Sequence, residues 1–370
     1  MGNAPQNTTK AQVTPKIKQA KARLLLGVQK FQFGADLRPG MVLGDCVLER
    51  ELDHGQCGVL WLAQQRGLNR KVTIKVLRRD LVAQSAHVDF QQRAEELAKL
   101  EHDSLAQVYA AGRSGHVQYL VQEHVPGISM NQLIQTLDGR RGTSENLFLS
   151  RIINALRDSV DMAPTKKRWV FGEDRNSMSV AMRHVAEIAE GLEYAHKKNI
   201  SHGSICDHNI VISESGCARL VNFSVKRGMT ARRAKLMRGY IPPEQARFGQ
   251  GSPTSDVYSL GVVLHKAITG QYPFSPSGEA LKRQYLIRRM KELSPATPRH
   301  LARMVARAIH PEARLRYATA GDFAKDLREY LDVYSSRCPF RSLAICGLWK
   351  LRENFRRWFR RSQHAMLFAD

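Results

Sequence analysis

The hydrophobic pattern of the chain changes near Pro126-Gly127. Before this point, short segments rich in β-branched residues are separated by glycine and asparagine, as at 42–50, 58–63 and 71–77, which is typical of antiparallel strands. After it, apolar residues recur with the spacing of a helical face. A chain of 370 residues with 43% hydrophobic content can bury a core of this kind. The sequence therefore predicts an α+β fold in which a small sheet precedes a larger helical region.

The order of the expected elements extends this pattern. Two more strands are expected at 106–112 and 117–124, with a helix at about 87–101 before them. The later helices are expected at 180–198, 255–269, 278–291, 297–309 and 320–334. The stretch 138–177 is weakly periodic and longer than most loops of a compact domain, so we interpret it as an insertion with one helix near 148–160.

The chain is strongly basic. Its 57 Lys and Arg residues exceed 34 Asp and Glu residues, which gives a net charge of +23 and an isoelectric point near 10.1. Such an excess favours anionic partners, namely phospholipid, nucleic acid or an acidic protein surface. The first acidic residue is Asp36, so residues 1–40 form a basic arm. No recognised nucleic-acid module accompanies the charge, and we predict no specific nucleic-acid partner.

The C-terminal tail combines basic residues with apolar ones at helical spacing between 340 and 361. Its apolar residues are Leu348, Leu351, Phe355, Trp358 and Phe359, and its basic residues include Lys350, Arg352, Arg356, Arg357, Arg360 and Arg361. This composition fits a helix that lies on an anionic membrane surface. The alternative is a helix that packs on the rest of the protein.

Sequence signals for export and membrane insertion are not evident. No run reaches the roughly 18 apolar residues that a membrane span needs, and the apolar stretch 24–28 is too short for a secretory signal. The six cysteines form no C-x-x-C pair and no metal-ligand spacing, which favours free thiols in a reducing compartment. We therefore expect a cytoplasmic protein, with peripheral membrane attachment as the variant that the tail suggests.

Eight short motifs follow one another at intervals that one family shares. They are Asp53–Leu60, Thr73–Val76, Gln122–His124, His202–Asn209, Asn222–Ser224, Tyr240–Glu244, Asp256–Gly261 and Pro311–Arg314. Together they resemble the eukaryotic-type serine/threonine protein kinases, including those of bacteria, over roughly 43–334. The resemblance implies a two-lobed fold with a β-rich small lobe at 41–125 and an α-helical large lobe at 126–334. The arm at 1–40 and the tail at 335–370 lie outside these lobes.

The resemblance also implies which residues would bind ATP. The residues at the matching positions are Gly55 and Gly58 of the glycine-rich loop, Lys75, Glu123 of the hinge, Asn209 and Asn222. Glycines let the backbone close over phosphates, and the lysine grips them. Asp53 replaces the first glycine, and Arg93 falls where the usual glutamate partner of Lys75 is expected.

The residues that move phosphate in this family are replaced. Ser204 stands at the position of the catalytic aspartate, and Asn222 stands where an aspartate usually binds Mg²⁺. A serine is no general base near neutral pH, and a neutral amide is a poor magnesium ligand compared with a carboxylate. The substitutions therefore argue against a Mg²⁺ site, for which Asn209 is the one weak ligand left. Asp207 is the nearby acid that could substitute if the loop were rearranged.

The residues that build the large lobe are kept. His202, Phe223, Glu244, Asp256 and Arg314 match structural positions of the family. We expect His202 and Phe223 to pack in the core, and we expect Glu244 to form an ion pair with Arg314.

Three functions follow from this pattern. The first is a pseudokinase that regulates or scaffolds signalling by binding a protein partner. The second is an atypical active serine/threonine kinase that transfers the γ-phosphate of ATP to protein and uses Asp207 or another acid. The third is a membrane-associated platform in which the basic tail is the functional part. Oligomeric state is not legible in the sequence.

Overall fold

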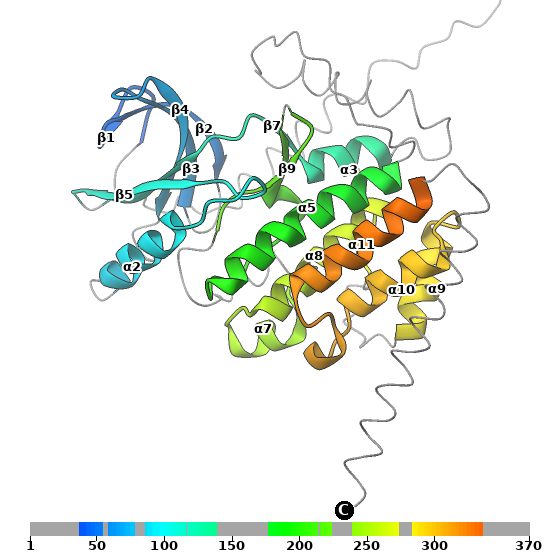
Figure 1. The fold of residues 1–370 in the computed structure, drawn as a ribbon. Coiled ribbons are helices and arrows are strands. Elements are labelled where there is room, and N and C mark those ends of the chain that lie inside the picture. Colours follow the sequence, from blue (N-terminus) through cyan, green and yellow to red (C-terminus); the bar gives the residue numbers. More distant parts are fainter. Residues whose placement is uncertain are drawn as a thin grey trace, which may run out of the picture.

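The computed structural model describes residues 37–54, 58–77, 86–115, 117–138, 177–213, 215–223, 239–273 and 283–335. Figure 1 shows a sheet-rich lobe with one helix beside it and a second lobe made mainly of helices. The predicted two-lobed α+β fold is thereby confirmed. Residues 1–36 of the arm, most of the insertion at 138–177 and the tail after 335 fall outside the described residues, as does the helix expected near 148–160.

The small lobe is built on a six-stranded antiparallel sheet in the order β1-β2-β3-β4-β6-β5. Its strands are β1 (Val42–Leu43), β2 (Cys46–His54), β3 (Gly58–Gln65), β4 (Arg70–Leu77), β5 (Val108–Ser114) and β6 (Val117–Glu123). The single strand expected at 42–50 is two strands. Gly44 has a φ of 62°, a left-handed conformation that glycine adopts readily, and it turns the chain between β1 and β2.

The two faces of this sheet enter different cores, because successive side chains of a strand point to opposite sides. Ile74 and Val76 belong to a cluster confined to the small lobe. Leu77 and Leu120 belong to a larger cluster that continues into the helical lobe. Lys75 lies between Ile74 and Val76 and is paired with Leu120 in the sheet register. Its side chain therefore faces the helical lobe.

Helix α2 (Ala86–Ala98) lies beside the sheet, close to the expected bounds. Its buried side chains Phe90, Ala94 and Leu97 belong to the larger cluster, so α2 shares a core with the helical lobe.

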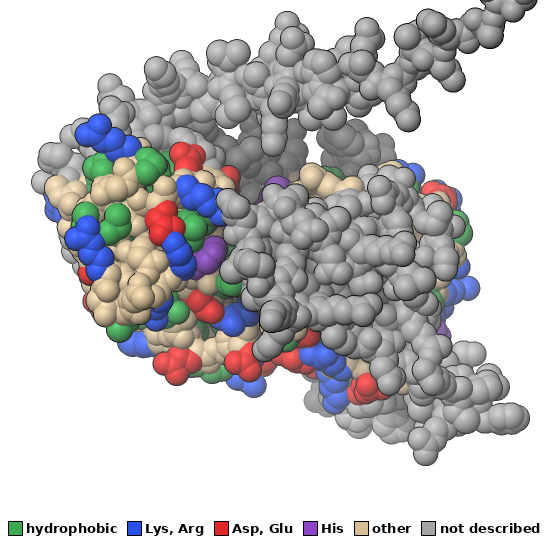
Figure 2. Space-filling view, turned by 90° about the horizontal axis from the view of Figure 1, so that it is seen from above, with side chains coloured by type: hydrophobic (Ala, Val, Ile, Leu, Met, Phe, Trp, Pro, Cys, Tyr) green, Lys and Arg blue, Asp and Glu red, His purple; other side chains and the backbone are tan. Residues whose placement is uncertain are grey.

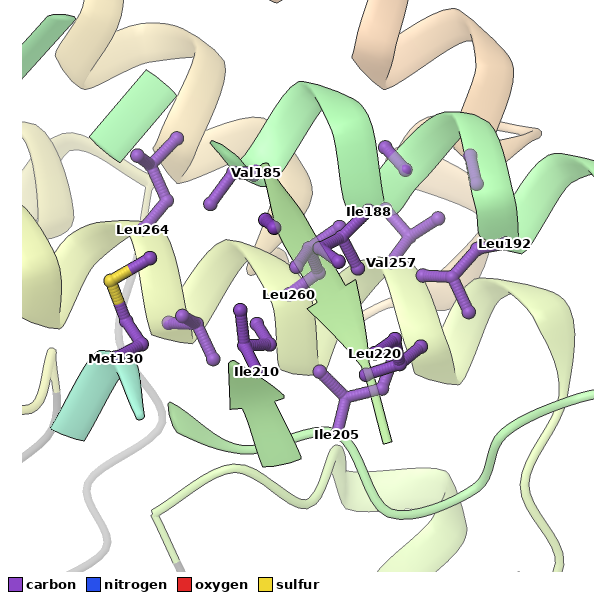
Figure 3. Packing of buried hydrophobic residues seen from close by; sticks show 14 of the residues in the cluster. Met130, Val185, Ile188, Leu192, Ile205, Ile210, Leu220, Val257, Leu260 and Leu264 are labelled. Carbon is purple, nitrogen blue, oxygen red and sulfur yellow. The ribbon is translucent and has the colours of Figure 1, made fainter. Parts of the chain in front are cut away.

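The large lobe surrounds helix α5 (Ser177–Lys197), which packs against α8 and α11. The other helices are α3 (Met130–Asp138), α7 (Pro243–Phe248), α8 (Pro253–Thr269), α9 (Arg283–Leu293), α10 (Arg299–Ala308) and α11 (Ala320–Ser335). Figure 3 shows how apolar side chains from α5, α8 and the neighbouring strands meet in one layer. The helices expected from periodicity at 180–198, 255–269, 278–291, 297–309 and 320–334 are confirmed, with shifted ends, whereas α3 and α7 were not predicted.

A second, three-stranded sheet lies against this lobe and carries the loop with the candidate site. It consists of β7 (Gly127–Ser129), β8 (Ile210–Ser213) and β9 (Ala218–Leu220). The loop between α5 and β8 includes the short 3-10 helix η3 (Asp207–Asn209). These strands are three or four residues long, too short for a periodic signal, and β7 pairs with β8 more than 80 positions away, which explains why the sequence did not predict them.

The surface that the structure describes carries charges of both signs. On the small-lobe side of Figure 2, basic and acidic side chains are interspersed. In the described ranges, none of the helices has the length and apolar character required to cross a membrane. The cysteines described there, Cys46, Cys206 and Cys217, carry free thiols.

Candidate active site

The buried carboxylate of Asp256 holds the loop at 202–209, which would carry catalysis. Asp256, in the first turn of α8, accepts hydrogen bonds from the backbone N–H groups of His202 and Gly203 at 2.8 and 2.9 Å. His196 Nε2 lies 2.9 Å from the same carboxylate. Gly203 has a φ of 70°, and nothing lies within 4 Å of the place where a Cβ would stand. The backbone conformation, not crowding, therefore favours glycine at 203.

His202 and Phe223 connect this loop to the segment that follows β9. Both side chains are buried, and their rings meet edge to face with centroids 4.5 Å apart. His202 Nε2 lies 3.1 Å from the Val221 carbonyl, and its Nδ1 accepts from the Ser204 N–H at 3.2 Å. Both ring nitrogens thus have backbone partners, and the ring serves packing.

Four residues form a polar chain across the candidate site. The Lys75 ammonium donates to Asn222 Oδ1. Asn222 Nδ2 donates to Asn209 Oδ1 at 3.2 Å, and Asn209 Nδ2 donates to the Ser204 carbonyl at 2.8 Å. Asn222 has a φ of 68°, a left-handed conformation that asparagine tolerates better than most residues. The structure therefore brings together Lys75, Asn209, Asn222 and Ser204, all of which the sequence singled out.

The polar chain does not fit a magnesium ion. Mg²⁺ prefers carboxylate and water ligands in a strict octahedron, but the polar chain contains no carboxylate. Its two side-chain amide oxygens, on Asn209 and Asn222, each accept a hydrogen bond. Within the described ranges, moreover, no group of three or more His, Cys, Asp or Glu side chains is arranged to hold a metal ion.

Asp207 is not placed to act as a substitute base. Its side chain is fully buried, and its Oδ2 accepts from Lys266 Nζ at 2.7 Å and from Asn131 Nδ2 at 3.0 Å. Burial alone would raise the pKa of Asp207, but hydrogen bonds from Lys266, Asn131 and Tyr240 outweigh it and hold the pKa below its ordinary value. In the present loop, this carboxylate is therefore a weak proton acceptor that is engaged in structural contacts. Its use as a substitute acid after a rearrangement of the loop stays a prediction.

Position 206 lies in the same loop, where the resemblance to protein kinases implies a lysine and this chain has Cys206. Desolvation raises the pKa of its thiol to about 11. The side chain is thus neutral near neutral pH and supplies no positive charge to a phosphate.

Arg93 makes contacts that the sequence did not reveal. It stands at the glutamate position of α2, and its guanidinium donates to Glu96 Oε2 at 2.9 Å and to the Ser201 carbonyl at 2.8 Å. The position that would hold a partner for Lys75 thus binds the residue just before the loop at 202–209. The motif spacing places Arg93 where the partner of Lys75 is expected, but it does not identify the Ser201 carbonyl as the group that Arg93 binds.

The expected ion pair between Glu244 and Arg314 is wrong. Arg316 binds Glu244 instead, through two hydrogen bonds of 2.7 and 2.8 Å, and its side chain is fully buried. Arg314 lies in the 3-10 turn η4 (Ala313–Leu315), where it is 84% exposed and paired with Glu312. Burial alone would raise the pKa of Glu244, but the bonds from Arg316 prevail and lower it.

The structure describes only some of the other residues that were expected to bind the nucleotide. Gly55 lies outside the described residues. Gly58 has a φ of 156°, and a Cβ there would lie 1.8 Å from the Val76 carbonyl oxygen, so this glycine is required by the approach of β3 to β4. The backbone N–H of Glu123 donates to the Gln107 carbonyl at 2.8 Å, and its carboxylate binds Arg219. Adenine contact by Glu123 stays a prediction.

A polar pair that the sequence did not predict lies beside the hinge. Thr73 Oγ1 and His124 Nδ1 are 3.3 Å apart. Thr73 precedes Lys75 by one full strand repeat and so faces the helical lobe with it. Burial lowers the pKa of His124, which favours the neutral ring.

Comparison with known proteins agrees with this fold and motif order. The family model described as protein tyrosine and serine/threonine kinase matches residues 46–320. The chain belongs to the protein kinase family.

Individual relatives are serine/threonine-protein kinases of bacteria. The chain is 26% identical to PrkC of Bacillus subtilis over 294 residues, which is 76% of this chain and 40% of PrkC. It is 28% identical to PknB of Mycolicibacterium smegmatis, covering 78% of this chain and 43% of that protein. The chain thus spans less than half the length of these relatives.

Among solved structures, the kinase domain of Mycobacterium tuberculosis PknI superposes with a TM-score of 0.57 at 18% identity. The match covers 79% of this chain and 99% of that domain. At this level of identity, the likeness shows the shared fold.

Proposed function

We propose that this protein is a pseudokinase, a protein kinase-like domain that acts by binding and not by phosphoryl transfer. The observation that carries the proposal is the polar chain. The catalytic acid position holds Ser204, the metal-ligand position holds Asn222, and both Asn side-chain oxygens are engaged in hydrogen bonds. Loss of a positioned general base costs roughly 10²- to 10⁴-fold in rate, and loss of charge stabilisation adds to that cost.

The scaffold supports a role in binding. Asp256, the His202–Phe223 contact and the Glu244–Arg316 pair hold the loop and the large lobe in place without any of the missing acids. A large lobe held in this way can present a docking surface to a protein partner, and we propose signalling or assembly as the setting.

A phosphotransfer assay tests the proposal. The full chain is incubated with γ-labelled ATP and a general protein substrate, with Mg²⁺ in one series and Mn²⁺ in another. Lys75→Ala, prepared in parallel, measures any contaminating kinase. We expect equal, background incorporation for both proteins. Incorporation by the wild-type chain that Lys75→Ala abolishes would overturn the pseudokinase proposal.

The second candidate is an active serine/threonine kinase. The names of the relatives favour it, since PrkC and PknB are called serine/threonine-protein kinases. In this case, ATP with a divalent cation would be the cofactor, as the family implies. Asp207→Asn in the same assay tests whether Asp207 is the catalytic base. Turnover that survives this substitution would show that another residue is the base.

The basic tail supports a further, separate proposal of an anionic membrane partner. It rests on the sequence of residues 340–361, where aromatic and basic residues alternate at helical spacing. Sedimentation with phosphatidylserine vesicles compares the full chain with a chain ending at Ser335. Binding that survives the deletion would contradict the tail as the anchor.

A further inference from the structure

The polar chain has an unusual charge for a site that would hold phosphates. Lys75 contributes one positive charge, and its partners Asn222, Asn209 and Ser204 are neutral. In a site built around Mg²⁺, carboxylates carry negative charge that the metal balances. The four residues of the polar chain itself carry no carboxylate, and hydrogen bonds among them satisfy both amide oxygens.

The groups that remain suit phosphate oxygens directly. An ammonium binds phosphate as a point charge, and amide N–H groups donate to the same oxygens. Lys75 is only 8% exposed, so its charge lies where water competes weakly. Asn222 and Asn209 lie beside it and are held by the backbone of the loop through the Ser204 carbonyl.

We propose that Lys75, Asn222 and Asn209 form a binding site for the phosphates of a nucleotide that enters without Mg²⁺. The inference rests on the proposed function and deepens it. It names a nucleotide as the ligand of a kinase-like protein that does not transfer phosphate. Asn222 is the residue that determines the metal independence, since it replaces a charged metal ligand with an amide already bonded to Lys75.

Phosphate chemistry is shared by nucleotides and by free polyphosphate. Leu60 is in register with Lys75 on the neighbouring strand and is only partly buried, so an apolar side chain lies beside the ammonium on the same face of the sheet and suits a base. We therefore commit to a nucleotide, and the experiment includes tripolyphosphate as a separate probe.

The test is calorimetric titration of the full chain with a non-hydrolysable ATP analogue, once in EDTA and once in Mg²⁺. We expect dissociation constants that agree within about two-fold, and at least about ten-fold weaker binding by Lys75→Met, as expected for a lost charge-assisted hydrogen bond. Tripolyphosphate should bind more weakly than the analogue. Binding that requires Mg²⁺, absence of binding in both buffers, or equal affinity for tripolyphosphate would overturn the inference.

Asn222→Asp is the matched variant. It changes one amide to a carboxylate of nearly the same shape, so we expect Mg²⁺ to strengthen binding of the analogue by at least about ten-fold in this variant only. An identical metal response in wild type and Asn222→Asp would contradict the role of Asn222. Circular dichroism and the unfolding midpoint verify that each variant is folded.

The two proposals fail in different ways. Turnover that depends on Lys75 contradicts the pseudokinase function. The metal dependence of binding, measured with an analogue that cannot be turned over, decides only the inference on Mg²⁺.

Discussion

Arg93 of helix α2 donates a 2.8 Å hydrogen bond to the backbone carbonyl of Ser201, the residue just before His202. The guanidinium also contacts Glu96 on the same helix, and Arg93 is only 8% exposed. The contact joins the helix of the small lobe to the loop of the large lobe. Together with the apolar side chains of α2 that enter the larger core, it fixes the helix to the large lobe without phosphate or metal.

Arg93→Ala should lower the free energy of unfolding by about 1–3 kcal/mol, because the Ser201 carbonyl loses a charged donor. Urea denaturation followed by fluorescence measures the change. Gln91→Ala, an exposed position of the same helix, is the matched control and should change stability by less than about 0.5 kcal/mol. Equal effects of the two substitutions would contradict the assigned contact.

Arg316→Ala should destabilise the large lobe by about 3–5 kcal/mol, since it leaves the partly buried Glu244 without its bidentate partner. Arg314→Ala removes an arginine two positions away whose ion pair is exposed, so its cost should stay below about 1 kcal/mol. Thermal and urea unfolding of both variants separate the two residues. A larger loss for Arg314→Ala would restore the pairing that sequence spacing suggested.

Stability should fall on acidification through His265. Burial lowers the pKa of this histidine from 6.5 to about 4, so the folded state binds the proton less readily than the unfolded state. The contribution of His265 is therefore complete above pH 6.5 and is lost as the pH falls toward and through about 4, with a slope of at most about 1.4 kcal/mol per pH unit.

Urea unfolding at several pH values between 7 and 4 measures this effect. His265→Asn retains a donor near the position of Nδ1, which lies 2.9 Å from the Gln271 carbonyl, and should show a flatter pH dependence than wild type. His208→Asn, at a side chain 69% exposed, should keep the wild-type slope. A slope unchanged in His265→Asn would show that other groups cause the acid sensitivity.

Gly58→Ala should cost more stability than Gly40→Ala. Both glycines have a positive φ, but a Cβ at 58 would lie 1.8 Å from the Val76 carbonyl oxygen, whereas nothing lies within 4 Å at 40. Strain alone costs about 1 kcal/mol at Gly40. At Gly58, the backbone strain of an alanine costs about 1–3 kcal/mol. The shift of strand β3 that relieves the clash with Val76 should add to this cost. Unfolding curves with equal midpoints for the two variants would contradict the steric account.

The sequence predicted the fold because its signals are local and repeated. Strand alternation, helical spacing and the order of the motifs each require only neighbouring residues, and together they defined both lobes. Lys75, Asn209, Asn222 and Ser204 were singled out in the same way, by matching motifs one at a time.

Contacts between distant residues were predicted less well. Arg314 and Arg316 are two positions apart, and the turn η4 that exposes one and buries the other carries no clear sequence signal. The bond from Arg93 to Ser201 spans 108 positions and ends on a carbonyl, a group that every residue has. The partner of Asp207 is Lys266, which belongs to no motif.

The carboxylate of Asp256 has a consequence for how this loop tolerates mutation. Its two oxygens accept hydrogen bonds from the backbone N–H groups of residues 202 and 203. Asp256 of α8 therefore fixes the path of the loop at 202 and 203 through main-chain groups, which every residue has, while the Ser204 side chain is buried beside His202. A substitution at 204 that fits this buried space leaves both backbone hydrogen bonds in place, so the loop can keep its path while its chemistry changes.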